Sequence, residues 1–263
     1  MLKTRMITAV IGAPVILFLI YLDLGVWPIG LMVLTLSTVG LIEFYAPWPS
    51  KNLFPASGLG IMFGCLFPII ATLKVTQLYQ PILVVALVSS ALWHMFSSRK
   101  TRLGVDVGLT MLGILYAGFM PSFIILIRGI ANGRMLLFSL VLSVWACDIA
   151  AYAVGRTLGK NKLAETISPA KTIEGAIAGL LASVAVAVCF IIWGGLPVYK
   201  MIALGIIVGV FSQAGDLFAS MIKREVGIKD FGKSIPGHGG VLDRFDGLFF
   251  VAPLVFYLFT LYW

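Results

Sequence analysis

Acidic, basic and glycine residues are crowded into residues 229 to 246, KDFGKSIPGHGGVLDRFD. Asp243 and Asp246 lie three residues apart, so on a helix their carboxylates point to the same side. Paired carboxylates are hard oxygen ligands of the kind that Mg²⁺ prefers. The segment therefore predicts chemistry around a divalent cation.

Basic side chains close to these acids supply the opposite charge, which suits the oxygens of phosphate groups. They are Lys223, Arg224, Lys229, Lys233 and Arg244. Gly237, Gly239 and Gly240 surround His238 in a turn where missing side chains would let backbone N–H groups approach an anion. Together these features favour phosphoryl or nucleotidyl transfer, which depends on positioning and charge neutralisation. A simple reversal between two helices is the alternative for the turn alone.

Two stretches upstream repeat polar side chains at helical spacing. Gln213, Asp216, Ser220 and Lys223 follow one another at intervals of three, four and three residues, so they share one helix face. Asp148 begins a similar stripe with residues 152 and 155. A membrane helix would not turn such a stripe toward lipid. Buried salt bridges that hold a helical bundle together are the alternative explanation.

The longest polar segment, residues 155 to 175, is GRTLGKNKLAETISPAKTIEG. Ser168 is predicted to cap a helix that has Pro169 at its first position. Backbone N–H groups at such a helix start, together with Lys171 and Thr172, would suit an anion. An ordinary basic loop fits the same residues equally well.

The elements that must position these residues are apolar. The chain is 60% hydrophobic and only 11% charged, too little polar surface for an ordinary soluble domain. Runs of about 20 apolar residues recur, each long enough to cross a bilayer as a helix. We predict an all-α fold, a polytopic transmembrane bundle of about nine spans. They are expected near residues 6–24, 26–46, 54–73, 78–96, 104–127, 135–154, 173–193, 198–220 and 241–262.

The predicted organisation is a single integral membrane domain, residues 1–263, with hydrophobic spans in 1–134 and a catalytic half in 135–263. With the N-terminus in the cytoplasm, fifteen of the 19 lysines and arginines fall on the cytoplasmic side. Topology and attraction to anionic headgroups then explain the net charge of +8 without a nucleic-acid partner. We expect a multi-pass protein of the inner (plasma) membrane, with the C-terminus outside and the site on the cytoplasmic side.

The run SMIKREVGIKDFGKSIPGHGGVLDRFD, residues 220 to 246, resembles the signature of the phosphatidate cytidylyltransferases, or CDP-diacylglycerol synthases. Further motifs similar to the family are GD at 215–216, DxxAYxxGRxxGKxKL at 148–163 and SPxKTxEG at 168–175. Ile149 departs from the pattern, which has Ser or Thr there. The resemblance covers roughly the C-terminal half, and the first five spans match only in being hydrophobic.

The resemblance implies an integral membrane enzyme that condenses CTP with phosphatidate, using Mg²⁺, to give CDP-diacylglycerol and pyrophosphate. Asp216, Asp243 and Asp246 would bind the metal and act in catalysis with Lys223, His238 and Arg244. The substrate-binding residues would be Asp148, Ser168, Lys171, Thr172, Ser220, Arg224, Lys229, Lys233, Gly237, Gly239 and Gly240. A second cation and a homodimer are both compatible with this assignment.

Rival functions differ in what they require. A cytidylyltransferase acting on another lipid phosphate would share every motif above. An ion or phosphate transporter would carry polar groups toward both membrane faces, whereas these gather at one. A CDP-alcohol phosphotransferase would carry DGxxAR before GxxxDxxxD, which this sequence lacks. Among the remaining polar residues, His94 is predicted to be a packed bundle residue, and Glu43 is equally compatible with a structural and a functional role.

Overall fold

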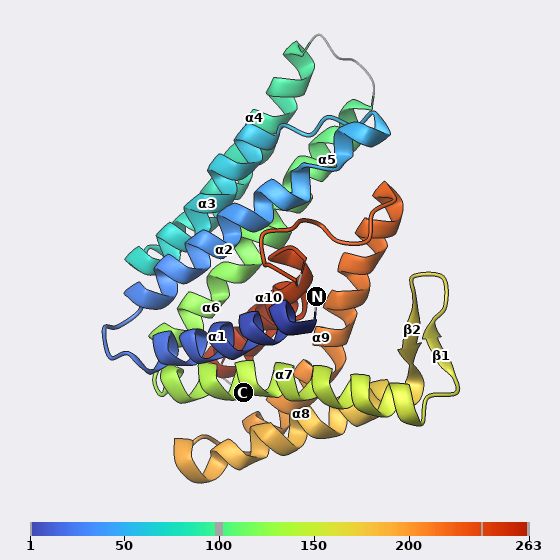
Figure 1. The fold of residues 1–263 in the computed structure, drawn as a ribbon. Helices are drawn as coiled ribbons and strands as arrows, with labels where there is room; N and C mark the ends of the chain where they lie inside the picture. The colour runs from blue at the N-terminus through green and yellow to red at the C-terminus, as the bar shows by residue number, and fades with distance from the viewer. Residues whose placement is uncertain (1, 98–101, 238, 262–263) are drawn as a thin grey trace. The chain divides into compact units, whose positions relative to one another are not determined.

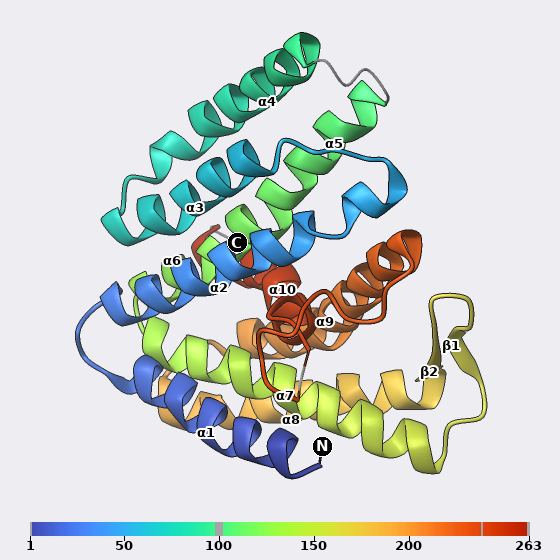
Figure 2. The same ribbon diagram turned by 45° about the horizontal axis from the view of Figure 1, so that its top comes forward.

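The computed structural model describes residues 2–97, 102–237 and 239–261, and its fold is nearly all-α (Figures 1 and 2). Every predicted span is helical over most of its length in these residues. The helices are α1 (Leu2–Tyr21), α2 (Trp27–Tyr45), η1 (Trp48–Lys51), α3 (Ser57–Leu73), η2 (Thr76–Leu78), α4 (Tyr79–Phe96), α5 (Leu103–Gly113), the π-helical η3 (Ile114–Phe119), α6 (Met120–Gly129), α7 (Gly133–Thr157), α8 (Ile173–Gly194), α9 (Val198–Val226) and α10 (Leu242–Thr260).

Six helical stretches of the described residues are long and apolar enough to cross a membrane. They are Trp27–Lys51, Thr76–Phe96, Leu103–Gly129, Gly133–Thr157, Ile173–Ile192 and Val198–Val226. Val10–Tyr21 and Ser57–Leu73 are shorter apolar helices. The predicted count of about nine spans is therefore not confirmed, although the segments themselves are helical. The start of α10, for example, carries Asp243, Arg244 and Asp246.

The chain forms two compact units, each built from two stretches of sequence. The first unit comprises Met1–Leu126 and Glu225–Arg244. In it, α3 packs against α2 and η3. A Cβ atom added to Gly118 would lie 2.6 Å from the Cα of Gly64, so the two backbones touch there. As predicted, His94 is packed: it is 3% exposed and its ring nitrogens lie 2.8 and 3.1 Å from the carbonyl oxygens of Ser90 and Phe54.

The second unit comprises Ile127–Arg224 and Phe245–Trp263. Helices α7 and α8 run side by side (Figures 1 and 2). They approach closely because Gly175 and Gly179 of α8 face α7, where a Cβ atom would lie 2.6 Å from the Ala151 oxygen and 2.9 Å from Cys147 Sγ, respectively. The same four-residue spacing recurs at Gly205 and Gly209 of α9, which face α8. Small residues thus fix α8 between its two neighbours.

A β-hairpin connects α7 to α8 and is the main departure from the all-α prediction (Figure 1). It pairs β1 (Lys162–Ala164) with β2 (Ser168–Thr172) in antiparallel fashion. The predicted helix start at Ser168 and Pro169 is therefore wrong. A residue before proline favours extended backbone, and a proline is tolerated in an exposed edge strand. The cap is instead Thr172, whose Oγ1 accepts a hydrogen bond from the Gly175 N–H at 3.2 Å.

Candidate active site

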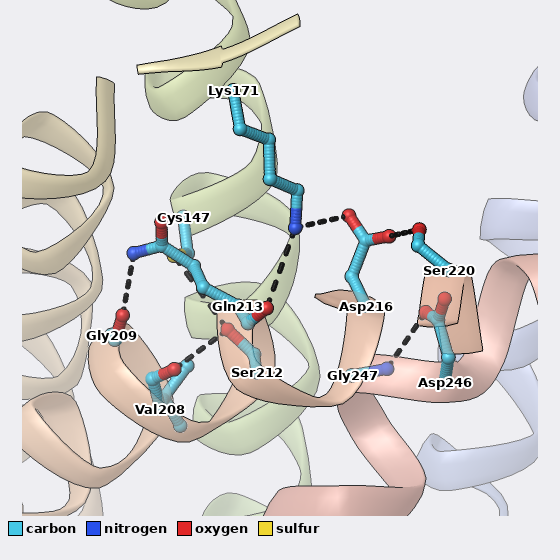
Figure 3. Close-up of polar contacts among 10 residues, drawn as sticks. All are labelled: Cys147, Lys171, Val208, Gly209, Ser212, Gln213, Asp216, Ser220, Asp246 and Gly247. Carbon is cyan, nitrogen blue, oxygen red and sulfur yellow. Dashed lines mark hydrogen bonds and ion pairs between the residues drawn. The ribbon is translucent and has the colours of Figure 1, made fainter. Parts of the chain in front are cut away.

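Asp216 forms an ion pair within the second unit. Its Oδ2 lies 2.7 Å from the Nζ of Lys171, which reaches α9 from strand β2 (Figure 3). The Lys171 ammonium also donates to the carbonyl oxygen of Gln213 at 3.3 Å. One turn further along α9, the Ser220 hydroxyl donates to Asp216 Oδ1 at 3.4 Å. The predicted polar stripe on α9 therefore exists and receives a lysine from the hairpin.

Asp246 is another acid of this unit, and it is only 8% exposed. Its Oδ1 accepts a hydrogen bond from the N–H of Gly247 at 2.8 Å (Figure 3). The charged groups that act on it are Asp216, Lys223 and Asp148, and Lys223 is itself 9% exposed. Lys171 thus pairs with Asp216, and Asp246 lies within electrostatic reach of Asp216 and Lys223. We call these four residues (Lys171, Asp216, Lys223 and Asp246) the acid–lysine cluster.

Glycine explains how the two carboxylates come together. A Cβ atom added to Gly215 would lie 2.8 Å from the Asp246 carbonyl oxygen and 2.8 Å from Phe250 Cβ. Gly247 of α10 similarly faces Ser212 of α9. The backbones of α9 and α10 thus touch next to both acids, an approach that larger side chains would prevent. The close approach of the two helices thus explains why the GD pair at 215–216 begins with glycine.

The cluster suits a divalent cation held partly by substrate. Among the residues that the structure describes, no three His, Cys, Asp or Glu side chains converge as a metal site. Mg²⁺ is nevertheless commonly bound by one or two carboxylates together with phosphate oxygens and water. Asp216 and Asp246 supply such a pair. Acids buried close together repel each other unless cations compensate them, and here lysines provide that charge.

The remaining predicted residues of the second unit surround the cluster or build its frame. Asp148 is exposed on α7. Thr172 is buried and occupied as the cap of α8, and Ser168 pairs with Ala164 in the hairpin. Arg224 is exposed and its Nε donates to the Ile167 carbonyl oxygen at 3.4 Å. Ser168 and Thr172 thus shape the strand that carries Lys171.

The other predicted residues belong to the first unit, where residues 227–241 form what we call the glycine loop. Asp243, in the first turn of α10, accepts hydrogen bonds on Oδ2 from the N–H groups of Phe231 (2.8 Å) and Gly240 (2.9 Å). Gly237 and Gly239 have φ of +78° and +89°, backbone that glycine adopts without strain. Lys229, Lys233 and Arg244 are exposed. His238 lies outside the described residues.

One buried acid has a contact that sequence patterns did not predict. Glu43 of α2 is 5% exposed, and its Oε2 accepts the N–H of Leu242 at 3.0 Å, across 199 residues of sequence. The signal that could have drawn attention to it is an isolated carboxylate in an apolar span, which is costly unless satisfied. Nothing in that span indicates where its partner lies.

Long apolar helices and a cluster of acids and lysines define a multi-pass membrane protein with a polar site. The chain belongs to the cytidylyltransferase family, whose model matches residues 3–262. The match therefore extends well beyond the C-terminal half to which the motifs pointed. Similar proteins are the phosphatidate cytidylyltransferases of Synechocystis sp. (31% identity over 288 residues, 98% of this chain and 96% of the relative), Bacillus subtilis (31% over 286, 99% and 98%) and Brucella suis (35% over 269, 98% and 93%).

Proposed function

We propose that this protein transfers the cytidylyl group of CTP to phosphatidate, giving CDP-diacylglycerol and pyrophosphate for phospholipid biosynthesis. The observation that carries the proposal is the acid–lysine cluster in a chain whose relatives, matched over nearly their full length, are phosphatidate cytidylyltransferases. In the reaction, a phosphate oxygen of phosphatidate attacks the α-phosphorus of CTP. The bond from that phosphorus to the bridging oxygen breaks, and the electron pair leaves with pyrophosphate.

The attacking group needs little activation, because the phosphate of phosphatidate is anionic at neutral pH. What the protein must do is bring anions together and compensate their charge. Lys171 and Lys223 bring positive charge to Asp216 and Asp246. The exposed cations Lys229, Lys233 and Arg244 are proposed to bind the triphosphate. His238 is proposed to donate a hydrogen bond or a proton to a phosphate oxygen.

Mg²⁺ is the proposed cofactor, with Asp216, Asp243 and Asp246 as its carboxylate ligands. When bound, it would neutralise the triphosphate and the developing charge on pyrophosphate. Asp216 and Asp246 fit this role as a pair within the second unit. Asp243 is proposed from the family signature, and in this structure its Oδ2 holds two loop N–H groups.

The experiment that tests the reaction uses purified protein with labelled CTP, phosphatidate and Mg²⁺. We expect CDP-diacylglycerol and pyrophosphate in equal amounts, with neither formed without phosphatidate. Polyprenyl phosphate and an archaeal-type diether phosphate serve as competing acceptors. Faster transfer to one of these would redefine the lipid substrate, and absence of transfer to any lipid phosphate would overturn the function.

The proposed location is the cytoplasmic side of the plasma membrane, with the N-terminus inside and the C-terminus outside. Fifteen basic residues against four support this orientation. Alkaline phosphatase fused after Trp263 should be active, whereas the same enzyme fused after Arg102 should be inactive. The opposite pattern would exclude both this topology and a cytoplasmic site.

A further inference from the structure

Glu43 connects an N-terminal helix of the first unit to the start of α10. Its Oε2 accepts the N–H of Leu242, the first residue of that helix, at 3.0 Å. The first N–H groups of a helix have no partner within the helix and carry partial positive charge, so a carboxylate is a favourable acceptor. Glu43 therefore caps α10 from another part of the chain.

Two glycines leave room for this carboxylate. A Cβ atom added to Gly232 would lie 2.5 Å from Glu43 Oε1, and one added to Gly240 would lie 2.6 Å from Oε2. Neither glycine has a positive φ, so the backbone there would accept an L-residue. A side chain at either position would therefore displace the Glu43 carboxylate or the loop.

The other carboxylate oxygen makes the contact costly in stability. Oε1 of Glu43 is buried and has no hydrogen-bond partner among the described residues. Leaving a buried acceptor unsatisfied costs stability, about 1–3 kcal/mol in typical cases. An apolar residue here would avoid that cost but would leave the Leu242 N–H without its acceptor. The acid therefore fixes the start of α10 at the expense of one unsatisfied oxygen.

We propose that Glu43 is a positioning residue that fixes the glycine loop and the start of α10, and thereby holds Lys229, Lys233, Asp243 and Arg244 for the triphosphate. This role rests on the proposed function, because it assigns the loop to CTP. Asp243 fixes the same loop from within, through the N–H groups of Phe231 and Gly240. Glu43 adds the connection to α2, which the loop cannot supply by itself.

Asp106 offers a matched control within the same unit. It is 2% exposed, and its Oδ1 accepts the N–H of Phe54 at 2.8 Å. Like Glu43, it is a buried acid that accepts a backbone N–H from a distant segment. That segment carries none of the predicted site residues. Glu43→Ala and Asp106→Ala should both lower the unfolding temperature. Only Glu43→Ala should lower kcat or raise the apparent KM for CTP, by about tenfold, as expected for losing a hydrogen bond to a charged group.

Amide hydrogen exchange provides a readout that does not depend on activity. Glu43→Ala should speed exchange at Leu242 and in residues 239–241, whereas Asp106→Ala should speed it at Phe54. Glu43→Gln keeps an oxygen acceptor and should restore most of the protection and part of the kcat. If wild type does not convert CTP, the proposed function fails, and the exchange pattern still decides whether Glu43 orders the loop.

A double-mutant cycle tests the steric half of the proposal. Gly240→Ala should be strongly destabilising in the wild type but nearly neutral when combined with Glu43→Ala, because the clashing carboxylate is gone. Gly239→Ala should be destabilising in both backgrounds, because its φ of +89° is strained for alanine in either case. Equal costs of Gly240→Ala in the two backgrounds, or equal kinetic effects of Glu43→Ala and Asp106→Ala, would overturn the proposal.

Discussion

The carboxylates of the candidate site and its frame differ in their partners between the two units. In the first unit, Glu43, Asp106 and Asp243 each accept backbone N–H groups. In the second unit, Asp216 meets the Lys171 ammonium and the Ser220 hydroxyl. Asp246 accepts its neighbour's N–H and is acted on by Lys223 and by Asp216. The first three acids are thus held by backbone N–H groups, whereas Asp216 is held by side chains and Asp246 has a lysine and a second acid within electrostatic reach.

This difference separates acids that hold the backbone in place from acids that can exchange one cation for another. A backbone N–H cannot leave a carboxylate unless the loop or helix that carries it moves. A lysine side chain has four flexible carbons, so it can turn from a carboxylate to a phosphate while the fold stays in place. Glu43, Asp106 and Asp243 are therefore suited to hold a segment of backbone in place. Asp216 and Asp246 are suited to exchange one cation for another.

The largest effect should come from the second unit. Asp246→Asn and Asp216→Asn should each remove most activity, roughly a hundredfold or more, because an amide is a neutral and poorer ligand for a hard cation. The deficit should be larger at low Mg²⁺. Mg²⁺ should also raise the unfolding temperature of the wild type and leave that of the variants unchanged. Normal turnover of CTP by both variants across a Mg²⁺ titration would assign these acids to structure.

Asp243 is the residue that best tests this comparison, because both roles are proposed for it. We propose it as a metal ligand from the resemblance to the family signature, although its Oδ2 holds two loop N–H groups. We expect Asp243→Asn to remove most activity in a Mg²⁺-dependent way and, in addition, to lower thermal stability by about 1–3 kcal/mol because two amides lose a charged acceptor. Kinetics at several Mg²⁺ concentrations, with Asp246→Asn beside it, separate the two roles. A loss of activity that does not respond to Mg²⁺ would make Asp243 a loop residue only.

The sequence predicted the elements better than their contacts. Long apolar runs identify the helices because burial in lipid leaves the chain few other ways to satisfy its backbone. The face shared by Asp216 and Ser220 follows from helical spacing alone, and the structure confirms it. The number of membrane crossings was less accessible, because polar helix starts such as that of α10 blur the hydropathy signal.

Contacts between segments far apart in the sequence could not be predicted. The cap predicted at Ser168 is wrong because pairing with β1 keeps that residue extended, and such pairing is not visible in a local motif. The partner of Glu43 is 199 residues away, and no pattern within α2 points to it. Metal binding, CTP contacts and the role of His238 remain predictions.

Lys171 gives a smaller and more specific effect. Lys171→Gln removes the ammonium that lies 2.7 Å from Asp216, so we expect about a tenfold loss of activity. Stability should change by less than about 1 kcal/mol, because both side chains are partly exposed. Lys162→Gln is the control: Lys162 belongs to the same hairpin and donates to the Pro169 carbonyl oxygen, away from the acids. Equal activity of the two variants would leave Lys171 no special role.

The smallest effects are expected from the exposed cations of the first unit. Lys229→Gln, Lys233→Gln and Arg244→Gln should each raise the apparent KM for CTP severalfold, because each removes one charge from the triphosphate. Their unfolding temperatures should stay close to that of the wild type, since exposed substitutions usually change stability by no more than about 0.5 kcal/mol. Lys74→Gln, exposed at the end of α3, is the control for charge alone. A drop of several degrees in unfolding temperature, with unchanged activity per folded molecule, would show that these cations serve the fold. They would then belong with the residues that hold the backbone in place.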